Sequence, residues 1–433
     1  MSSLELNIAK PLLLPCGLKL PNRLVRAALT EQWSDHKTLL PTEDLLHAYE
    51  LWAAGGWGMV ITGNVFIDPE YMGSMKDPAF SDLLSHEELL AAWRRWAKLM
   101  RKSGSPAVMQ LNHPGRQSPA GGGTRGYFAK AIAPSPVPVA LGPGYIAKAI
   151  SAIAFGTPRE MTTLEINLVV HRFAHAANLA AEAGFDGVQI HGAHGYLLTQ
   201  FLSEKTNQRS DEYGGSPKKR ARIVVEVIKA TRALVPKGFC IGIKINSVDH
   251  QSPSELQDCI EQLNEIVHSG IDFLEISGGS YEDPIMLDST ASQGLKKASA
   301  STITREAFFL EFAETIRKSF PNVHLMVTGG FRSRLGMENA VSGDACDMVG
   351  IGRPAILEPG LPKIVVFNSQ IPDEEARLKT KSFHRPWLAA AIGVKGLGGG
   401  QETVGALNSF RLHISSSANQ SYDDTAGIYR RNA

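Results

Sequence analysis

The sequence predicts an α/β fold, specifically a (β/α)8 TIM barrel with an inserted lid and a C-terminal extension. Three observations support this prediction. Eight short apolar runs rich in β-branched residues recur along the chain, as expected for buried strands. A segment with helical periodicity follows almost every run, and strict alternation of strand and helix favours a parallel sheet. Eight such units in about 350 residues suit a closed barrel better than an open sheet.

The strands are expected at 23–30, 58–65, 106–112, 187–192, 239–246, 272–279, 324–330 and 347–353. Helices are expected near 43–54, 86–102, 162–183, 217–234, 254–269, 304–319, 333–342 and 358–367. The segment 162–183 has the clearest helical signal. Thr162 and Glu165 have capping-box spacing, an apolar stripe runs along one face, and Gly184 follows the last turn.

Two segments interrupt the alternation. Residues 113–158, after the third strand, are rich in Pro and Gly and too long for a simple loop, so we expect an inserted lid over the barrel mouth. The barrel domain is expected to span 1–395. The extension from 396 to 433 is expected to be loosely folded or to pack on a neighbouring subunit, in a monomer or a homodimer.

Charge and composition narrow the function. The 44 basic and 43 acidic residues leave a net charge of +1, which gives no excess for binding nucleic acid or an anionic membrane. The four cysteines are scattered without the spacing of a zinc or iron–sulfur site, so free thiols are expected. The N-terminus lacks a signal-peptide pattern, and no run approaches the roughly 18 apolar residues of a membrane span. We expect a cytoplasmic protein with a small-molecule substrate.

Polar residues stand where the predicted strands end, which is where catalytic groups gather in such barrels. Examples are Thr30, Asn64 and Gln110. Lys244 lies within the apolar strand IGIKIN, where a buried ammonium is costly unless an anion meets it. That anion is either part of a ligand or a carboxylate of the barrel itself.

The seventh and eighth strands end in glycine-rich turns, Thr328-Gly329-Gly330-Phe331 and Gly350-Ile351-Gly352-Arg353. Glycine lets backbone N–H groups approach an anion closely, and the arginine adds a forked cationic donor. The loops after these two strands form the usual phosphate site of the fold. We therefore expect a phosphate-bearing ligand; the alternative is a pair of tight turns beside a surface arginine.

The stretch HGAHGY, residues 191–196, admits three interpretations. A metal site would need a third ligand, and the sequence offers none at an obvious position. A buried core turn would leave several donors without partners. The third interpretation is catalytic: His191 and His194 can donate hydrogen bonds to a substrate oxygen that gains negative charge, and the hydroxyl of Tyr196 can supply a proton.

Several segments together carry a resemblance. They are PNRLVRAALT, VMQLNHPGRQ, GFDGVQIHGAHGYLLTQFLSEKTNQRSDEYGGS, GIKIN and VTGGFRSR…DMVGIGRP. In this order they resemble successive blocks of the Old Yellow Enzyme family of FMN-dependent ene-reductases, from about residue 10 to 365. The resemblance implies FMN at the barrel mouth, NADPH or NADH as reductant, and reduction of the C=C bond of α,β-unsaturated carbonyl compounds.

The resemblance places these residues around FMN: Ala28, Thr30, Asn64, Gln110, Lys244, Gly329, Gly330, Phe331, Gly352 and Arg353. Arg353 would hold the phosphate and Gln110 would reach the pyrimidine ring. Lys244 would lie beside N1 and O2, where the family usually has arginine, and its charge would favour the anionic reduced flavin. Ala28 stands where the family often has proline.

For the substrate, the resemblance implies that His191 and His194 bind the carbonyl oxygen and that Tyr281 lines the pocket. Hydride would move from flavin N5 to the β-carbon, and Tyr196 would protonate the α-carbon. Two alternatives stay open. One is a flavin-dependent oxidase or isomerase that uses the same groups, and the other is a metal-dependent barrel hydrolase with His191 and His194 as ligands.

Overall fold

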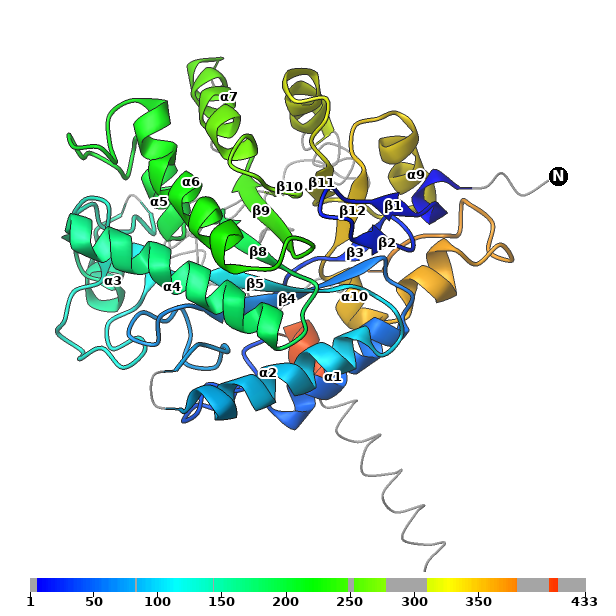
Figure 1. Ribbon diagram of the computed structural model, residues 1–433, viewed down its shortest axis with the longest axis horizontal. Coiled ribbons are helices and arrows are strands. Elements are labelled where there is room, and N and C mark those ends of the chain that lie inside the picture. Colours follow the sequence, from blue (N-terminus) through cyan, green and yellow to red (C-terminus); the bar gives the residue numbers. More distant parts are fainter. Residues whose placement is uncertain are drawn as a thin grey trace, which may run out of the picture.

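The computed structural model describes residues 6–81, 84–142, 144–247, 253–277, 310–379 and 405–411 (Figure 1). Eight parallel strands close into a barrel in the order β10-β11-β12-β3-β4-β5-β8-β9. Their bounds are β3 Leu24–Arg26, β4 Met59–Phe66, β5 Ala107–Asn112, β8 Gly187–Gly192, β9 Cys240–Asn246, β10 Phe273–Ser277, β11 Leu325–Thr328 and β12 Met348–Ile351. The predicted (β/α)8 barrel is therefore confirmed, and every predicted strand overlaps an observed one.

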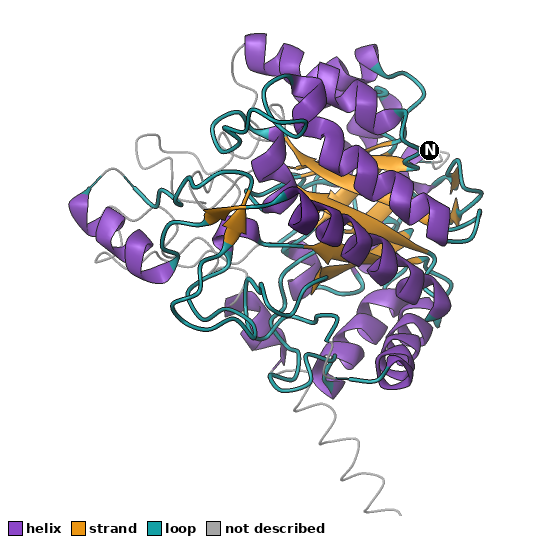
Figure 2. Ribbon diagram, turned by 60° about the vertical axis from the view of Figure 1, so that its left-hand side comes forward, coloured by secondary structure: helices purple, strands orange, loops and turns teal. Residues whose placement is uncertain are grey.

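Helices surround the barrel, as Figure 2 shows in purple around the orange strands. They include α1 Glu43–Ala54, α2 His86–Arg101, α4 Thr163–Glu182, α6 Pro217–Leu234, α7 Pro253–Val267 and α9 Arg334–Ser342. Residues 310–319 are also helical, while the start of the helix predicted at 304–319 lies outside the described residues. Within the described ranges, no helix has the length and apolar character that crossing a bilayer requires.

The helix predicted near 358–367 is confirmed in part. A π-helix, η3 Pro362–Val366, lies within that range, and the short α10 Pro354–Leu357 precedes it. Each of these two pieces has a proline in its first turn. Proline is favoured there because its fixed φ suits a helix start and its missing N–H has no role in that turn. Glu358 between them has an extended backbone, which ends the first piece.

The helix α4 forms as its sequence predicts. The backbone N–H of Thr162 donates to the Glu165 carboxylate at 2.8 Å, and the backbone N–H of Glu165 donates to the Thr162 hydroxyl at 3.2 Å. This capping box satisfies donors that the first helical turn would otherwise leave unpaired. The apolar stripe through Val169 and Phe173 is buried in the core between the helix and the barrel. The pattern thus fixes both the start of α4 and the face that it buries.

The amino-terminal end of the barrel is closed by a hairpin of β1 Leu12–Leu13 and β2 Lys19–Leu20. We call this end the floor. Its side chains form one buried apolar cluster of Leu12, Leu14, Leu20, Val25, Ala27, Met59, Ile61, Val108, Cys240, Phe273, Met326 and Met348. A methyl group added at Gly242 would lie 2.1 Å from the ring of Phe273, so glycine there makes room for the aromatic side chain. The floor is packed like a protein core.

The carboxyl-terminal end of the strands is the mouth. The segment 113–158 leaves the barrel there, after β5, and contains η2 Gly115–Gln117, β6 Ile132–Ala133 and α3 Tyr145–Ala154. The strand β6 pairs with β7 Arg159–Glu160, just past the segment. The amide Nε2 of Gln117 donates to the backbone oxygen of His194 at 3.1 Å. The insert therefore contacts the loop after β8, and its role as a lid stays a prediction.

Part of the C-terminal extension packs on its own barrel. Residues 405–411 form a helical segment. The ring of Phe410 lies 6.3 Å from that of Trp33 and 5.6 Å from that of Trp52. Arg411 forms an ion pair of 2.6 Å with Asp44 at the start of α1. These residues therefore pack on their own barrel, and most of the extension from 396 to 433 lies outside the described residues.

Candidate active site

His191 lies in β8 at the mouth and is buried. Its Nδ1 accepts a hydrogen bond of 3.2 Å from the backbone N–H of Ala193. A neutral imidazole has one donor and one acceptor nitrogen, so this bond leaves the proton on Nε2. Burial, assisted by the neighbouring His194 and Lys244, holds the pKa of His191 well below its usual value. His191 is therefore a neutral hydrogen-bond donor through Nε2.

His194 is held in a strained backbone conformation with φ of +59°. Its backbone N–H donates to Asn246 Oδ1 at 2.9 Å, and its ring Nε2 lies 3.1 Å from the hydroxyl of Ser277. Burial, with a smaller effect of Lys244, lowers the pKa of His194 to about 3. A left-handed conformation of a residue other than glycine costs roughly 1–3 kcal/mol and is typical of functional sites.

The tyrosine of the same loop completes a group of three rings. Tyr196 is the N-cap residue of α5 Leu197–Leu202 and is buried. Its ring packs edge-on against that of His191 with 4.9 Å between centroids, and the rings of His191 and His194 are 5.0 Å apart. The structure thus brings together the three residues that the sequence singled out as catalytic.

A chain of buried polar side chains crosses four strands at the mouth. Gln110 Nε2 donates to Gln189 Oε1 at 2.7 Å, and Gln189 Nε2 donates to Glu275 Oε2 at 2.6 Å. The ammonium of Lys244 lies 2.9 Å from Glu275 Oε1. All four side chains are nearly inaccessible to solvent. We call this set the mouth network, and two of its members, Gln189 and Glu275, were not predicted from the sequence.

The mouth network contains one of the two partners considered for Lys244. Its ammonium is paired with a carboxylate of the barrel, because Lys244 and Glu275 lie opposite each other in the register of β9 and β10. The ammonium and Glu275 Oε1 form a charge-assisted contact, and both side chains are buried. The pair has no net charge, and a carboxylate of the barrel was one of the two anions expected from the sequence.

Thr30 and Asn64 lie together on the other side of Gln110. Asn64 Nδ2 donates to Thr30 Oγ1 at 3.0 Å, and Asn112 Nδ2 donates to Asn64 Oδ1 at 3.2 Å. Asn64 is opposite Gln110 in the register of β4 and β5. Ala28, half-buried, precedes Thr30 in the same segment. These predicted cofactor-binding residues therefore line adjacent strand ends.

A buried ion pair, which was not predicted from the sequence, supports the segment that carries Thr30. Arg26 donates to Glu31 at 2.7 Å, and its guanidinium lies 3.9 Å from the ring centroid of Trp52. The hydroxyl of Tyr49 donates to the same carboxylate at 2.8 Å and accepts from the backbone N–H of Gly63 at 2.6 Å. This network ties the loop after β3 to α1 and β4.

The predicted phosphate residues lie at the ends of neighbouring strands. Gly329 and Gly330 follow β11 with φ of +148° and +77°, conformations that favour glycine. Gly352 and Arg353 follow β12, which pairs directly with β11. Phe331 is buried beside them. Tyr281, the predicted substrate contact, lies outside the described residues.

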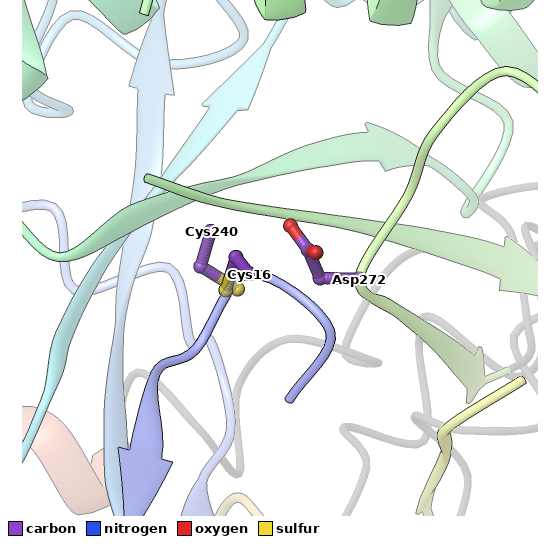
Figure 3. A group of neighbouring side chains, drawn as sticks. All are labelled: Cys16, Cys240 and Asp272. Atoms are coloured by element: carbon purple, nitrogen blue, oxygen red, sulfur yellow. The ribbon is translucent and has the colours of Figure 1, made fainter. Parts of the chain in front are cut away.

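The floor holds a separate cluster of potential metal ligands, Cys16, Cys240 and Asp272, shown in Figure 3. Their ligand atoms lie within 4.8 Å of one another. Asp272 Oδ2 already accepts bonds of 2.7 Å from both Arg232 and the backbone N–H of Ile241. Sequence spacing had not brought the two cysteines together. Among the described residues, no cluster of this kind includes His191 or His194.

Comparison with known proteins shows which protein family the sequence matches. The model of the NADH:flavin oxidoreductase / NADH oxidase family matches residues 8–373. An NADH-dependent flavin oxidoreductase of Hypocrea jecorina is 47% identical over 393 residues, covering 91% of this chain and 97% of that protein. A protein of the same description from a Neonectria species is 48% identical over 398 residues, 90% of this chain. The chain spans about half of that relative, 52%.

More distant similarities agree. An NADH oxidase of Thermoanaerobacter brockii is 29% identical over 351 residues, covering 80% of this chain and 49% of that protein. The structure of an old yellow enzyme homologue from Zymomonas mobilis aligns with a TM-score of 0.66 at 24% identity, covering 84% of this chain and 93% of that one. A 2-naphthoyl-CoA reductase complex aligns with a TM-score of 0.73 at 22% identity, covering 93% and 58%. At such identities the two structures support the fold.

Proposed function

Because the chain belongs to the NADH:flavin oxidoreductase / NADH oxidase family, we propose that it reduces the C=C bond of α,β-unsaturated carbonyl compounds. The protein is an NAD(P)H-dependent flavin oxidoreductase, and FMN is its cofactor. The observation that carries the proposal is the convergence of His191, His194 and Tyr196 at the barrel mouth, with the proton of His191 fixed on Nε2. This arrangement suits the binding of a carbonyl oxygen.

The residues of the mouth fit FMN. Within the described residues, no hydrogen bond uses Gln110 Oε1, and the buried oxygens Thr328 Oγ1 and Asn112 Oδ1 have no partner. Buried polar atoms usually bond to the protein, to ordered water or to a ligand, so these oxygens are available to a cofactor at the mouth. When bound, FMN supplies N5, which takes a hydride from the nicotinamide and passes it to the alkene.

We assign the cofactor contacts as follows. Arg353 and the backbone around Gly329, Gly330 and Gly352 would hold the phosphate, because left-handed glycine turns expose N–H groups to an anion. Gln110 would meet the pyrimidine ring. The remaining contacts to the ring system are Ala28, Thr30, Asn64, Lys244 and Phe331. Tyr281 is proposed to line the substrate pocket.

The two histidines bind and activate the substrate in this proposal. Both are neutral, because burial and Lys244 hold their pKa values low. His191 donates from Nε2 to the carbonyl oxygen, and His194, the neighbouring ring, supplies the second donor. These hydrogen bonds strengthen as negative charge develops on that oxygen, so they stabilise the enolate more than the bound ketone. Neutral donors keep this function throughout the neutral pH range.

Tyr196 is proposed to protonate the α-carbon. Its ring is fixed against His191, so the acid and the carbonyl-binding group form one rigid unit. A phenol has an ordinary pKa of about 10, which makes it a weak acid that gives its proton only to a strongly basic carbon. The proton therefore moves after the hydride has created the enolate.

The test compares the two half-reactions in Tyr196→Phe. We expect anaerobic bleaching of the flavin by NADH within about twofold of wild type, and reoxidation by 2-cyclohexen-1-one slowed about 100- to 10,000-fold. Tyr213→Phe is the matched control, because it removes a hydroxyl that bonds Glu226 at 3.0 Å, away from the mouth. Equal loss of both half-reactions in Tyr196→Phe would contradict the proton-donor role.

A second candidate function is an NADH oxidase, because one relative carries that name. Dioxygen would then take the electrons in place of the alkene, with no need for a proton from Tyr196. Mixing the anaerobically reduced protein with oxygen or with the enone in separate stopped-flow runs distinguishes the two. Faster reoxidation by oxygen that is insensitive to Tyr196→Phe would favour the oxidase.

A further inference from the structure

We propose that Glu275 is a positioning residue that sets both the charge and the hydrogen-bond polarity of the flavin pocket. It would act on the cofactor through Lys244 and through the two glutamines of the mouth network. The inference rests on the proposed position of FMN at the barrel mouth. It goes further by giving a role to a residue that makes no proposed contact with cofactor or substrate.

The polarity follows from which atoms can donate. An ionised carboxylate only accepts hydrogen bonds, so Gln189 must turn its Nε2 towards Glu275. Gln189 then presents Oε1 to Gln110, which must answer with Nε2. Gln110 is left with Oε1 and with the second N–H of Nε2. Because its Nε2 is turned to Gln189, Oε1 is the acceptor that Gln110 can offer the ligand, and it would match the N3–H donor of the flavin pyrimidine. Glu275 therefore sets the orientation of a side chain three strands away.

The charge argument concerns Lys244. An isolated cation at a flavin favours the anionic reduced form and so favours reduction. Here the carboxylate lies 2.9 Å from the ammonium, and both side chains are at most 3% exposed. Water screens such a buried pair very little, so the carboxylate offsets most of the field of the ammonium. Glu275 would thus keep the reduced flavin a stronger hydride donor than Lys244 alone would allow.

The first experiment measures the ratio of the dissociation constants of oxidised and reduced FMN, obtained from the midpoint potentials of bound and free FMN with reference dyes. In Glu275→Gln, which keeps the shape and removes the charge, reduced FMN should gain about tenfold or more over oxidised FMN. Glu275→Asp draws the charge back by one methylene, so a smaller gain in the same direction is expected. Unchanged ratios in both variants would overturn the charge role.

The matched control is Asp272→Asn. Asp272 is a buried carboxylate immediately before the same strand, β10, but at the floor and paired with Arg232. Its replacement should leave the ratio within about twofold of wild type, since its charge is compensated far from the mouth. A shift as large as that of Glu275→Gln would mean that any buried charge on this strand changes the flavin, and the specific role would be lost.

The second experiment tests the hydrogen-bond polarity by reversing the direction of the hydrogen bonds that run from Gln110 through Gln189 to Glu275. In Gln110→Glu, the new carboxylate faces Gln189 Oε1, and Gln189 cannot turn because Glu275 holds its amide. We expect FMN binding to weaken at least about tenfold, as for an unsatisfied buried pair of acceptors. Adding Glu275→Gln allows the whole chain to reverse and should restore most of the affinity. A double variant as weak as Gln110→Glu would overturn the polarity role.

These measurements separate the two proposals. Flavin affinity and midpoint potential need no alkene, so both can succeed in a protein that fails to reduce enones. Conversely, normal enone reduction with unchanged ratios in the Glu275 variants would leave the proposed function standing and refute this inference. Should Glu275→Gln fail to fold, Glu275→Asp alone carries the charge test, and no gain for reduced FMN in it would refute the charge role.

Discussion

The mouth and the floor of the barrel lie at opposite ends of the same strands, and they differ in the polarity of their buried side chains. On β9, Cys240 belongs to the apolar floor, and four residues later Lys244 is a buried cation at the mouth. On β10, Phe273 fills the floor, and two residues later Glu275 is a buried anion. On each of these two strands, one buried side chain near the floor is apolar and one nearer the mouth is charged.

The two ends also differ in how well they satisfy their buried polar atoms. At the floor, the carboxylate of Asp272 is bonded by Arg232 and by a backbone N–H. At the mouth, Asn112 Oδ1, Thr328 Oγ1 and His113 Nε2 have no hydrogen-bond partner among the described residues. Buried polar atoms usually have a partner in the protein, in ordered water or in a ligand. The mouth therefore has polar atoms that a ligand can satisfy, whereas the Asp272 carboxylate is already bonded within the floor.

The largest expected effect comes from breaking the ion pair of the mouth. Lys244→Met leaves the Glu275 carboxylate buried without its cation, and we expect the free energy of unfolding to fall by about 3–5 kcal/mol. The double variant Lys244→Met/Glu275→Leu removes both charges and should recover most of that loss. FMN affinity should stay low in both variants. Urea denaturation of the apoprotein and fluorescence titration with FMN measure the two quantities.

The outcome bears directly on the comparison of the two ends. Recovery of stability without recovery of FMN binding would show that the pair is retained for the ligand. If the double variant is as unstable as the single one, the pair is structural, and the mouth resembles the floor more than we argue. Asp272→Asn provides the floor reference, because its partner Arg232 is only partly buried and can turn to solvent.

Much of this contrast could be predicted from sequence. The alternation of strands and helices predicted the barrel fold, and the polar residues at the strand ends predicted the location of the site at the mouth. Both predictions succeed because each pattern is local in the sequence. Thr30, Asn64, Gln110, His191, His194 and Lys244 all lie at or near those strand ends. Their chemical roles remain proposals, and Tyr281 lies outside the described residues.

The pairs of side chains that meet across strands could not be predicted from the sequence, because they depend on the register of the strands and on the closure of the barrel. Glu275 stands opposite Lys244 only because β9 and β10 pair in one particular register, which the barrel as a whole sets. Cys16 meets Cys240 because the hairpin folds under the floor. A glutamate within FLEIS was a visible signal, since a charge in an apolar strand needs a partner, yet nothing in the sequence named Lys244 as that partner.

A medium-sized effect is expected from pH at the mouth. Burial lowers the pKa of His113 to about 3, whereas an unfolded histidine titrates near its ordinary value of about 6.5. As pH falls through this window, the unfolded chain takes up a proton that the folded protein does not, so stability is lost. His113→Asn should retain about 2 kcal/mol more stability at pH 5, relative to pH 7.5, than wild type.

Thermal or urea unfolding at pH 7.5 and pH 5 measures this difference. His171, an exposed histidine on α4, provides the control, and His171→Asn should lose as much stability on acidification as wild type does. An unchanged acid sensitivity in His113→Asn would mean that His113 is protonated in the folded protein, so that the mouth is wetter than its burial indicates.

The smallest effect is expected at the thiol pair of the floor. Cys16 is half-buried while Cys240, Cys259 and Cys346 are buried, so a thiol reagent should modify one cysteine quickly in the native protein. The hydrogen bond from the Cys240 thiol, with that from the backbone N–H of Leu18, lowers the pKa of Cys16, which speeds this reaction.

Because thiols form weak hydrogen bonds, Cys16→Ser should change the free energy of unfolding by less than about 1 kcal/mol. The same variant should leave the midpoint potential of bound FMN unchanged, since an uncharged group at the floor exerts little field at the mouth. If it moves the potential as far as Glu275→Gln does, the two ends of the barrel are coupled, and the division of stability and chemistry between them does not hold.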